Sequence, residues 1–210
     1  MPHNLIRVAH AAFCATLLAA PLPVHAADDT AAAAQWSAAA MMDDLMWNRG
    51  PIGGPFTLTD SNGRRRSSSE FRGKLMVIYF GYTSCPDVCP TDLMAIAQAI
   101  DALGADGAAV QPIFITIDPE RDTPEQLTRY AAAFHPRLIA LTGSADEIRA
   151  VATAFKAYYA IARDPRDGEV RVDHNGVIYL MGRDGDYLGF MPPQTEPARL
   201  TDVLRRQLGK

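Results

Sequence analysis

The stretch LMVIYFGYTSCPDVCP, from Leu75 to Pro90, decides the fold and frames the chemistry. It begins with a continuous apolar run, which is typical of a β-strand that is covered on both faces. Two cysteines, Cys85 and Cys89, follow with three residues between them. Because proline disfavours helical dihedral angles in the residue before it, we expect the next helix to begin after Cys89. The thiols would then lie at a helix N-terminus, where backbone N–H groups and the helix dipole stabilise thiolates.

The segments that follow predict a parallel βαβ unit. A helical pattern in Thr91–Gly107 leads to a second apolar strand at Pro112–Ile117, and this spacing is that of a right-handed crossover. A helix over 123–135 capped by Thr123, a strand in 137–143 and a helix over 144–159 capped by Ser144 continue the alternation of helices and strands.

The last third of the chain has a different order. The strands Val177–Met181 and Tyr187–Met191 flank a tight turn at Asp184–Gly185, which predicts an antiparallel hairpin, and a final helix follows in 195–208. A βαβ unit followed by ββα predicts an α/β protein with a thioredoxin-like fold. Its mixed central sheet carries helices on both faces and ends in a C-terminal ββα unit.

The composition is that of an ordinary globular protein. The chain has 210 residues, of which 48% are hydrophobic and 21% are charged, and its formal net charge is -4. This length fits one domain with tails. The acidic balance argues against nucleic acid as a partner, because such a partner favours a basic face.

The first 26 residues predict an export signal. Arg7 precedes a short apolar core in Val8–Ala20, and small residues stand at Val24 and Ala26. The core is shorter than the ~20 residues that span a bilayer as a helix. We therefore expect cleavage after Ala26, with an uncleaved anchor as the alternative, and a periplasmic protein that is soluble or tethered to the inner membrane.

Residues 27–50 are predicted to be a flexible tether, and residues 51–210 to form the thioredoxin-like domain. Met41, Met42 and Met46 lie in the tether, where the alternative to a mobile arm is a set of soft-metal ligands.

Three kinds of site compete for Cys85 and Cys89: a structural disulfide, a redox dithiol and a soft-metal site. In an exported chain these two thiols form a bond unless something reduces or ligates them. Dithiol oxidoreductases typically have two intervening residues, whereas this chain has three. In a thioredoxin-like sheet, the loop that carries His174 faces the thiols. Two thiolates and one imidazole favour Cu(I), whereas zinc would need a fourth ligand or water.

Four segments together resemble the Sco/SenC family, whose members are exported thioredoxin-like copper proteins that serve cytochrome c oxidase assembly. The segments stand in the family's order: FGYTSCPDVCPTDL, ITIDPERDTPEQL, LTGSADEI and VDHNGVIYLMGRDGDYLGF. The resemblance covers the chain from about Gly53 to its C-terminus.

The resemblance implies a role for each candidate residue. Cys85, Cys89 and His174 are expected to ligate one copper ion per chain, as Cu(I) or Cu(II), and the two cysteines are also the expected redox pair. Asp118 matches an acidic residue near the site. It is expected to hold the metal ligands in place without binding the metal itself, or to contact a partner; a turn-forming role is the alternative. Asp173 is a candidate for orienting His174, with a solvated loop residue as the alternative.

The implied function is delivery of copper to the dinuclear copper site of cytochrome c oxidase, or reduction of the cysteines there. The implied partners are the copper-site subunit of that oxidase, a periplasmic thiol reductant and another periplasmic copper chaperone. Two alternatives remain at this point. One is a metal-free thiol-disulfide oxidoreductase or peroxide-reducing enzyme, and the other is a redox or copper sensor.

Overall fold

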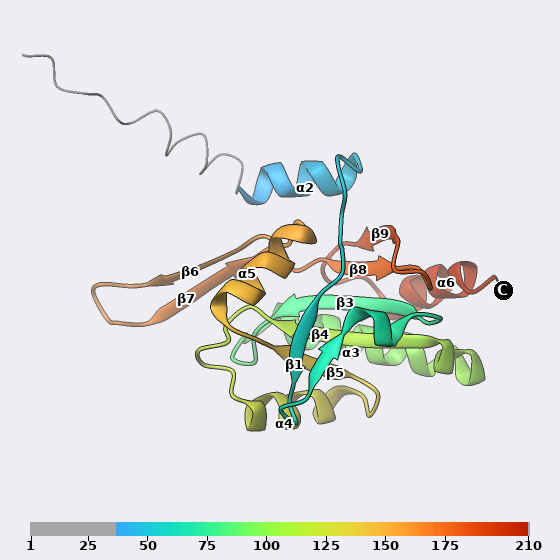
Figure 1. The fold of residues 1–210 in the computed structure, drawn as a ribbon, viewed down its shortest axis with the longest axis horizontal. Coiled ribbons are helices and arrows are strands. Elements are labelled where there is room, and N and C mark those ends of the chain that lie inside the picture. Colours follow the sequence, from blue (N-terminus) through green and yellow to red (C-terminus); the bar gives the residue numbers. More distant parts are fainter. Residues whose placement is uncertain (1–36, 210) are drawn as a thin grey trace, which may run out of the picture.

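The computed structural model describes residues 37–209, and Figure 1 shows their arrangement. The predicted export signal and residues 27–36 of the predicted tether lie outside the described residues. Within the described part of the chain, no helix is both long enough and apolar enough to span a membrane.

A seven-stranded mixed sheet forms the centre of the molecule, in the order β2-β1-β5-β4-β3-β8-β9. Strands β3, β4 and β5 are parallel, and the remaining pairs are antiparallel. The prediction of a mixed sheet with a C-terminal hairpin is therefore confirmed. The strands are β1 (Thr57–Asp60), β2 (Arg65–Ser67), β3 (Leu75–Gly81), β4 (Val110–Thr116), β5 (Ile139–Thr142), β8 (Ile178–Met181) and β9 (Tyr187–Met191).

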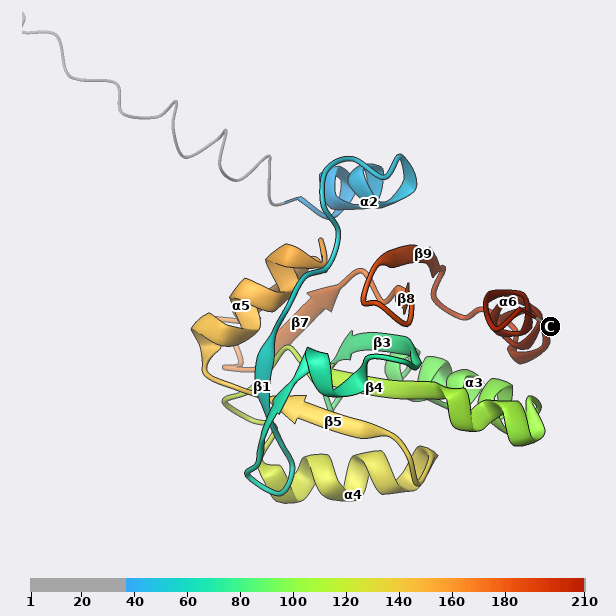
Figure 2. The ribbon, with the colours of Figure 1, turned by 45° about the vertical axis from the view of Figure 1, so that its right-hand side comes forward.

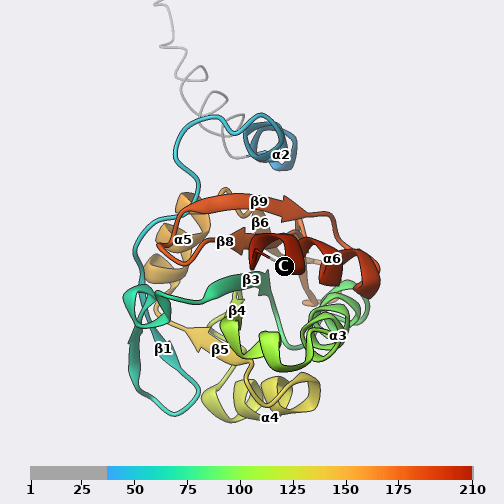
Figure 3. The ribbon, with the colours of Figure 1, turned by 90° about the vertical axis from the view of Figure 1, so that its right-hand side faces the viewer.

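Helices cover both faces of this sheet. The helices are α3 (Val88–Asp101), α4 (Pro124–Phe134), α5 (Ala145–Ala154) and α6 (Pro197–Gln207), with short 3₁₀ turns η1 (Ser68–Phe71) and η2 (Gly104–Ala109). Helices α3, α4 and α6 pack on one face, where Figure 3 shows α3 beside α6, and α5 packs on the other. Figure 2 shows α4 and α5 on opposite sides of the strands. The predicted caps Thr123 and Ser144 both form capping boxes.

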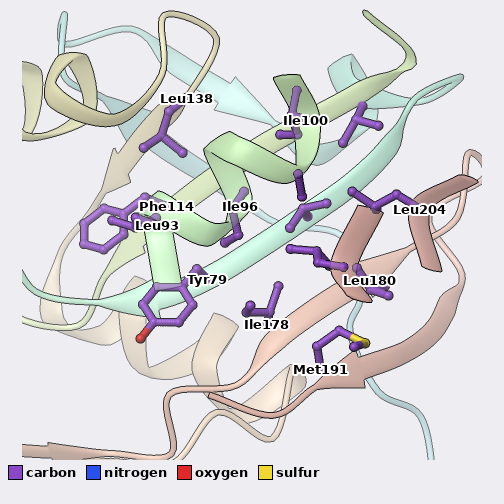
Figure 4. Packing of buried hydrophobic residues seen from close by; sticks show 14 of the residues in the cluster. Tyr79, Leu93, Ile96, Ile100, Phe114, Leu138, Ile178, Leu180, Met191 and Leu204 are labelled. Carbon is purple, nitrogen blue, oxygen red and sulfur yellow. The ribbon is translucent and has the colours of Figure 1, made fainter. Parts of the chain in front are cut away.

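Strand β3 is buried on both faces, as its apolar run predicts. Leu75, Val77 and Tyr79 join the cluster under α3, α4 and α6, part of which Figure 4 shows, while alternate residues join the cluster under α5. Burial of one such side chain stabilises the fold by about 1.5–3 kcal/mol. The residues that follow β3 are therefore held on a rigid strand.

The predicted start of the cysteine-bearing helix is wrong. Helix α3 begins at Val88, with Asp87 as its N-cap residue, and so includes Cys89 in its first turn. Pro90 is tolerated there because the N–H groups of the first helical turn have no intrahelical partner. Cys85 remains in the loop before the helix.

A second, two-stranded sheet was not expected from the sequence. Strands β6 (Tyr159–Arg163) and β7 (Val170–His174) form an antiparallel hairpin that projects from the main sheet in Figure 1. The helix capped by Ser144 was predicted to continue through Tyr159, but it ends at Ala154. Lys156 then takes a left-handed φ of 55°, which turns the chain into β6.

The described half of the predicted tether contains a helix, α2 (Ala38–Met46). Leu45 packs into the cluster under α5, and Lys156 forms an ion pair of 3.1 Å with Asp44. Met41 is buried, whereas Met46 is exposed. The soft-metal alternative for these methionines remains untested.

Candidate metal centre

Two cysteine sulfurs and one histidine nitrogen meet at one end of the main sheet. The Sγ atoms of Cys85 and Cys89 and one ring nitrogen of His174 all lie within 4.8 Å of one another. Cys89 Sγ lies 3.4 Å from His174 Nε2, within hydrogen-bonding distance for sulfur. In residues 37–209, no Asp, Glu or further His or Cys joins this cluster. The arrangement is a set of two sulfurs and one nitrogen, which suits a soft ion of low coordination number.

Each ligand comes from a different element. Cys85 lies in the loop after β3, Cys89 in the first turn of α3, and His174 is the last residue of β7. The sequence placed His174 in a loop before β8. The structure instead places it at the end of the projecting hairpin, where it pairs with Tyr159.

The two sulfurs differ in charge and in access. A hydrogen bond from the Cys89 thiol, together with one from His174, lowers the pKa of Cys85 to about 3 despite its partial burial. The neighbouring Cys85 sulfur and burial raise the pKa of Cys89. Cys85 retains 9% of its surface, and Cys89 retains none. Without a metal, the pair therefore holds one thiolate on the accessible side and one buried thiol.

His174 is oriented by its own turn and by two aromatic rings. Its Nδ1 accepts a hydrogen bond of 3.2 Å from the backbone N–H of Gly176, which leaves Nε2 directed at Cys89. The rings of Tyr79 and Tyr82 stand edge-on to the imidazole at 6.3 Å and 6.0 Å. The ring has little freedom to turn away from the sulfurs.

The backbone of Gly81 lies against the buried sulfur. A Cβ atom built on this residue would stand 2.9 Å from Cys89 Sγ and 3.0 Å from side-chain carbons of Phe114 and Tyr79. Only glycine leaves room for the sulfur at this point.

Asp122 holds the cysteine loop in place. This buried carboxylate accepts hydrogen bonds from the backbone N–H and the hydroxyl of Thr83, at 3.0 Å and 2.5 Å, and from the Thr116 hydroxyl at 2.5 Å. Asp122 lies in the segment ITIDPERDTPEQL but is not among the site residues predicted from the sequence. The available signal was a second acid in the loop that follows a buried strand.

Asp118 and Asp173 lie outside the ligand cluster. Asp118 is buried and forms an ion pair with Arg121 in its own loop, while its N–H donates to Thr116 Oγ1. Asp173 is exposed on β7, next to His174, and no hydrogen bond between them is found among the described residues. Their expected supporting roles stay predictions.

Comparison with known proteins assigns the chain that carries this centre to a family. A family model described as SCO1/SenC matches residues 46–209, which include the main sheet and all three cluster residues. This chain belongs to the SCO1/SenC family. The SCO1/SenC chain is 41% identical over 157 residues to the mitochondrial SCO2 homolog of Bos taurus, with 74% of this chain and 59% of that protein covered. It thus spans about three fifths of the length of that relative.

Solved structures of SCO1/SenC relatives share the fold. The copper-bound structure of Arabidopsis thaliana ScoI is 40% identical, with a TM-score of 0.69 over 75% of this chain and 98% of that one. A structure of BsSco, described as having a disulfide switch and as a member of the Sco family of cytochrome c oxidase assembly proteins, is 28% identical. Its TM-score is 0.58, over 76% of this chain and 95% of that one. The predicted thioredoxin-like fold is confirmed by these neighbours and by the sheet order.

Proposed function

We propose that this chain binds one copper ion, as Cu(I) or Cu(II), through Cys85, Cys89 and His174, and passes it to an acceptor protein. The observation that carries the proposal is the meeting of two sulfurs and one imidazole nitrogen within 4.8 Å. Thiolate and imidazole are preferred copper ligands, and no fourth protein ligand from the described residues is present for a tetrahedral zinc site. The copper-bound ScoI relative supports the same choice of metal.

The geometry of the site suits transfer of the bound copper ion to another protein. Three ligands from three elements can be replaced one at a time by those of an acceptor. The partly exposed Cys85 sulfur is the side from which an incoming ligand can approach, since Cys89 is fully enclosed. Binding needs both sulfurs reduced, so a Cys85–Cys89 disulfide would abolish it and link copper loading to redox state.

The proposed acceptor is the copper-site subunit of a cytochrome c oxidase, reached in the periplasm. The family resemblance and the description of the BsSco relative support this partner. A periplasmic thiol reductant would keep the cysteines reduced, and another periplasmic copper chaperone is the proposed copper source.

A second candidate function is thiol-disulfide exchange, which the unequal cysteines favour. The Cys85 thiolate would attack a disulfide of the partner, forming a mixed disulfide and releasing one partner thiolate. Cys89, after giving up its proton to that thiolate, would attack Cys85 and release the second partner thiolate, which takes a proton from water. The partner gains two electrons, the chain becomes a disulfide, and a periplasmic dithiol reductant restores it.

Copper titration of the reduced protein tests the proposal and separates the two functions. We expect one copper per chain with a sulfur-to-copper charge-transfer band, lost in Cys85→Ser and after oxidation to the disulfide. His174→Ala should lose tight copper binding yet still reduce a model disulfide, while His135→Ala, which changes a buried histidine outside the cluster, should bind copper normally. Copper binding that is unchanged in His174→Ala and Cys85→Ser would refute the proposed site.

A further inference from the structure

The projecting β6–β7 hairpin has two faces of different character. Residues directly opposite each other in a ladder share a face, and so do alternate residues along a strand. His174 therefore lies on the same face as its partner Tyr159 and as the pair Ile161–Val172. The opposite face carries only small or charged side chains. We call the first of these the hairpin face, and its residues are Tyr159, Ile161, Arg163, Val170, Val172 and His174.

A cavity of about 500 Å³ lies along the hairpin face. Tyr159, Ile161 and Val170 line one side of it, and the loop 117–121 and the first turns of α5 line the other. Figure 1 shows α5 beside the hairpin. The volume falls in the ~300–1,000 Å³ range of sites that enclose drug-sized ligands, so bulky side chains of a partner fit inside. Ile161 leaves 45% of its surface exposed and offers an apolar contact that this chain does not cover.

The charged residues around this cavity favour an acidic partner. Arg121, Arg149 and Arg163 line it together with two acids, Asp118 and Glu120. Arg121 and Asp118 already neutralise each other in an ion pair. Three basic groups against two acidic groups give the lining a net charge of +1, whereas the whole chain carries -4. The cavity is therefore a basic site on an acidic protein.

Two of these arginines are available to a partner. The Arg163 guanidinium donates to the backbone oxygen of Gly168 at 2.8 Å, and no carboxylate in residues 37–209 forms an ion pair with it. Arg149 pairs with Asp146, but both side chains are well exposed, and such surface pairs contribute little. A carboxylate from another molecule can therefore bind both guanidinium groups without breaking a strong contact.

The hairpin face also connects the cavity to the metal centre. Strands rise about 3.3 Å per residue. The Ile161–Val172 pair thus lies about 7 Å along the hairpin from His174, and the Arg163–Val170 pair about 13 Å from it. A protein that is seated in the cavity therefore stands against the copper ligand His174.

We propose that the hairpin face and its cavity are the docking surface for the copper acceptor, which places an apolar side chain beside Ile161 and a carboxylate against Arg149 and Arg163. This inference rests on the proposed function, since the acceptor is the copper-site subunit named there. A second copy of this chain is a poorer occupant. A symmetric dimer pairs a patch with itself, so two positively charged linings would face each other.

The rate of copper transfer to the reduced, metal-free copper-site domain of the oxidase subunit tests this docking surface. We expect Ile161→Asp and Arg163→Glu each to lower the second-order rate constant by about tenfold, as for a central interface residue. Chelator competition should give wild-type copper affinity for both variants, because neither residue belongs to the ligand cluster. Raising the ionic strength from about 0.01 M to about 0.15 M should slow the wild type more than Arg163→Glu, since salt screens the attraction.

The β8–β9 hairpin provides matched controls at the other end of the sheet. Leu188→Asp replaces an exposed apolar residue, and Arg183→Glu replaces an exposed arginine. The turn between these strands follows Met181, which pairs with Met76 near the start of β3, whereas both cysteines follow the end of that strand. Both control variants should transfer copper at the wild-type rate.

Wild-type rates in both Ile161→Asp and Arg163→Glu would overturn the docking surface and leave the proposed function standing. An equal loss in the two control variants would overturn it as well. If thermal melting shows that Ile161→Asp does not fold, the exposed Arg163→Glu change decides the matter.

Backbone amide NMR shifts decide the matter if the wild type binds no copper or passes none, an outcome that would refute the proposed function. On addition of the metal-free acceptor domain to the reduced, copper-free protein, shift changes in β6, β7 and the loop 117–121 support the docking surface. Changes elsewhere, or no changes, overturn it. Changes at the same amides that depend on protein concentration without the acceptor would show self-association and overturn it too.

Discussion

Replacement of Gly81 by alanine tests whether the backbone of β3 sets the position of the Cys89 sulfur. The added Cβ would stand 2.9 Å from Cys89 Sγ and 3.0 Å from carbons of Phe114 and Tyr79. Favourable separations are about 3.5–4.0 Å, so each contact is too short by about 0.5–1 Å. All three neighbours are buried and cannot move aside freely.

Overpacking of this kind costs about 1–3 kcal/mol of folding free energy. For a chain of this size, that loss corresponds to a fall in melting temperature of about 2–12 °C. The sulfur must also shift away from its place near Cys85 and His174, so copper affinity should fall together with stability. Thermal melting of the reduced protein and chelator competition for copper measure the two effects.

A double-mutant cycle makes this test specific. Serine at position 89 has a smaller side-chain atom than cysteine, so Gly81→Ala should destabilise Cys89→Ser less than it destabilises the wild type, by about 0.5 kcal/mol or more. Gly143→Ala is the control, because its Cβ would crowd the carboxylate and Cβ of Glu147 and a methyl group of Leu58, all outside the metal centre. It should lower stability without changing copper affinity. A Gly81→Ala protein with wild-type melting temperature and copper affinity would refute the reasoning.

Three further predictions concern the same centre. Because the pKa of Cys85 is lowered to about 3, its alkylation rate should stay nearly constant between about pH 8 and pH 5; a rate that falls tenfold per pH unit below about 8.5, as for an ordinary thiol, would contradict this. Asp122→Ala leaves the N–H and hydroxyl of half-buried Thr83 and the buried hydroxyl of Thr116 without their acceptor and should cost about 3 kcal/mol in chemical denaturation, with weaker copper binding; equal stability in Asp122→Ala and the wild type would disprove the anchoring role. Copper at a hundred times its dissociation constant should raise the free energy of unfolding by up to about 2.7 kcal/mol, and this gain should vanish in His174→Ala; an equal gain in that variant would argue against the histidine ligand.

Local signals in the sequence were sufficient for the main sheet. The apolar run of β3, the capping residues Thr123 and Ser144 and the Asp184–Gly185 turn each act within a few residues of the element they define, and all were found in the structure. Strand, cap and turn preferences are local physical effects, so they can be read without knowledge of the fold.

The projecting hairpin and the supporting acids could not be read in this way. The residues after Ala154 continue the helical pattern, and only the left-handed turn at Lys156 redirects them into β6. Asp92 accepts a hydrogen bond from the backbone N–H of Gln194, which is 102 positions away in the chain. No local sequence pattern indicates such a contact. This contact depends on the packing of α3 against the loop after β9.

X-ray absorption spectroscopy of the copper-loaded protein tests the central claim most directly, because it counts the atoms bound to the metal. We expect two sulfur scatterers and one imidazole nitrogen per copper, with the imidazole signal lost in His174→Ala and one sulfur lost in Cys85→Ser. A copper ion surrounded by nitrogen and oxygen atoms, without sulfur, would contradict the account.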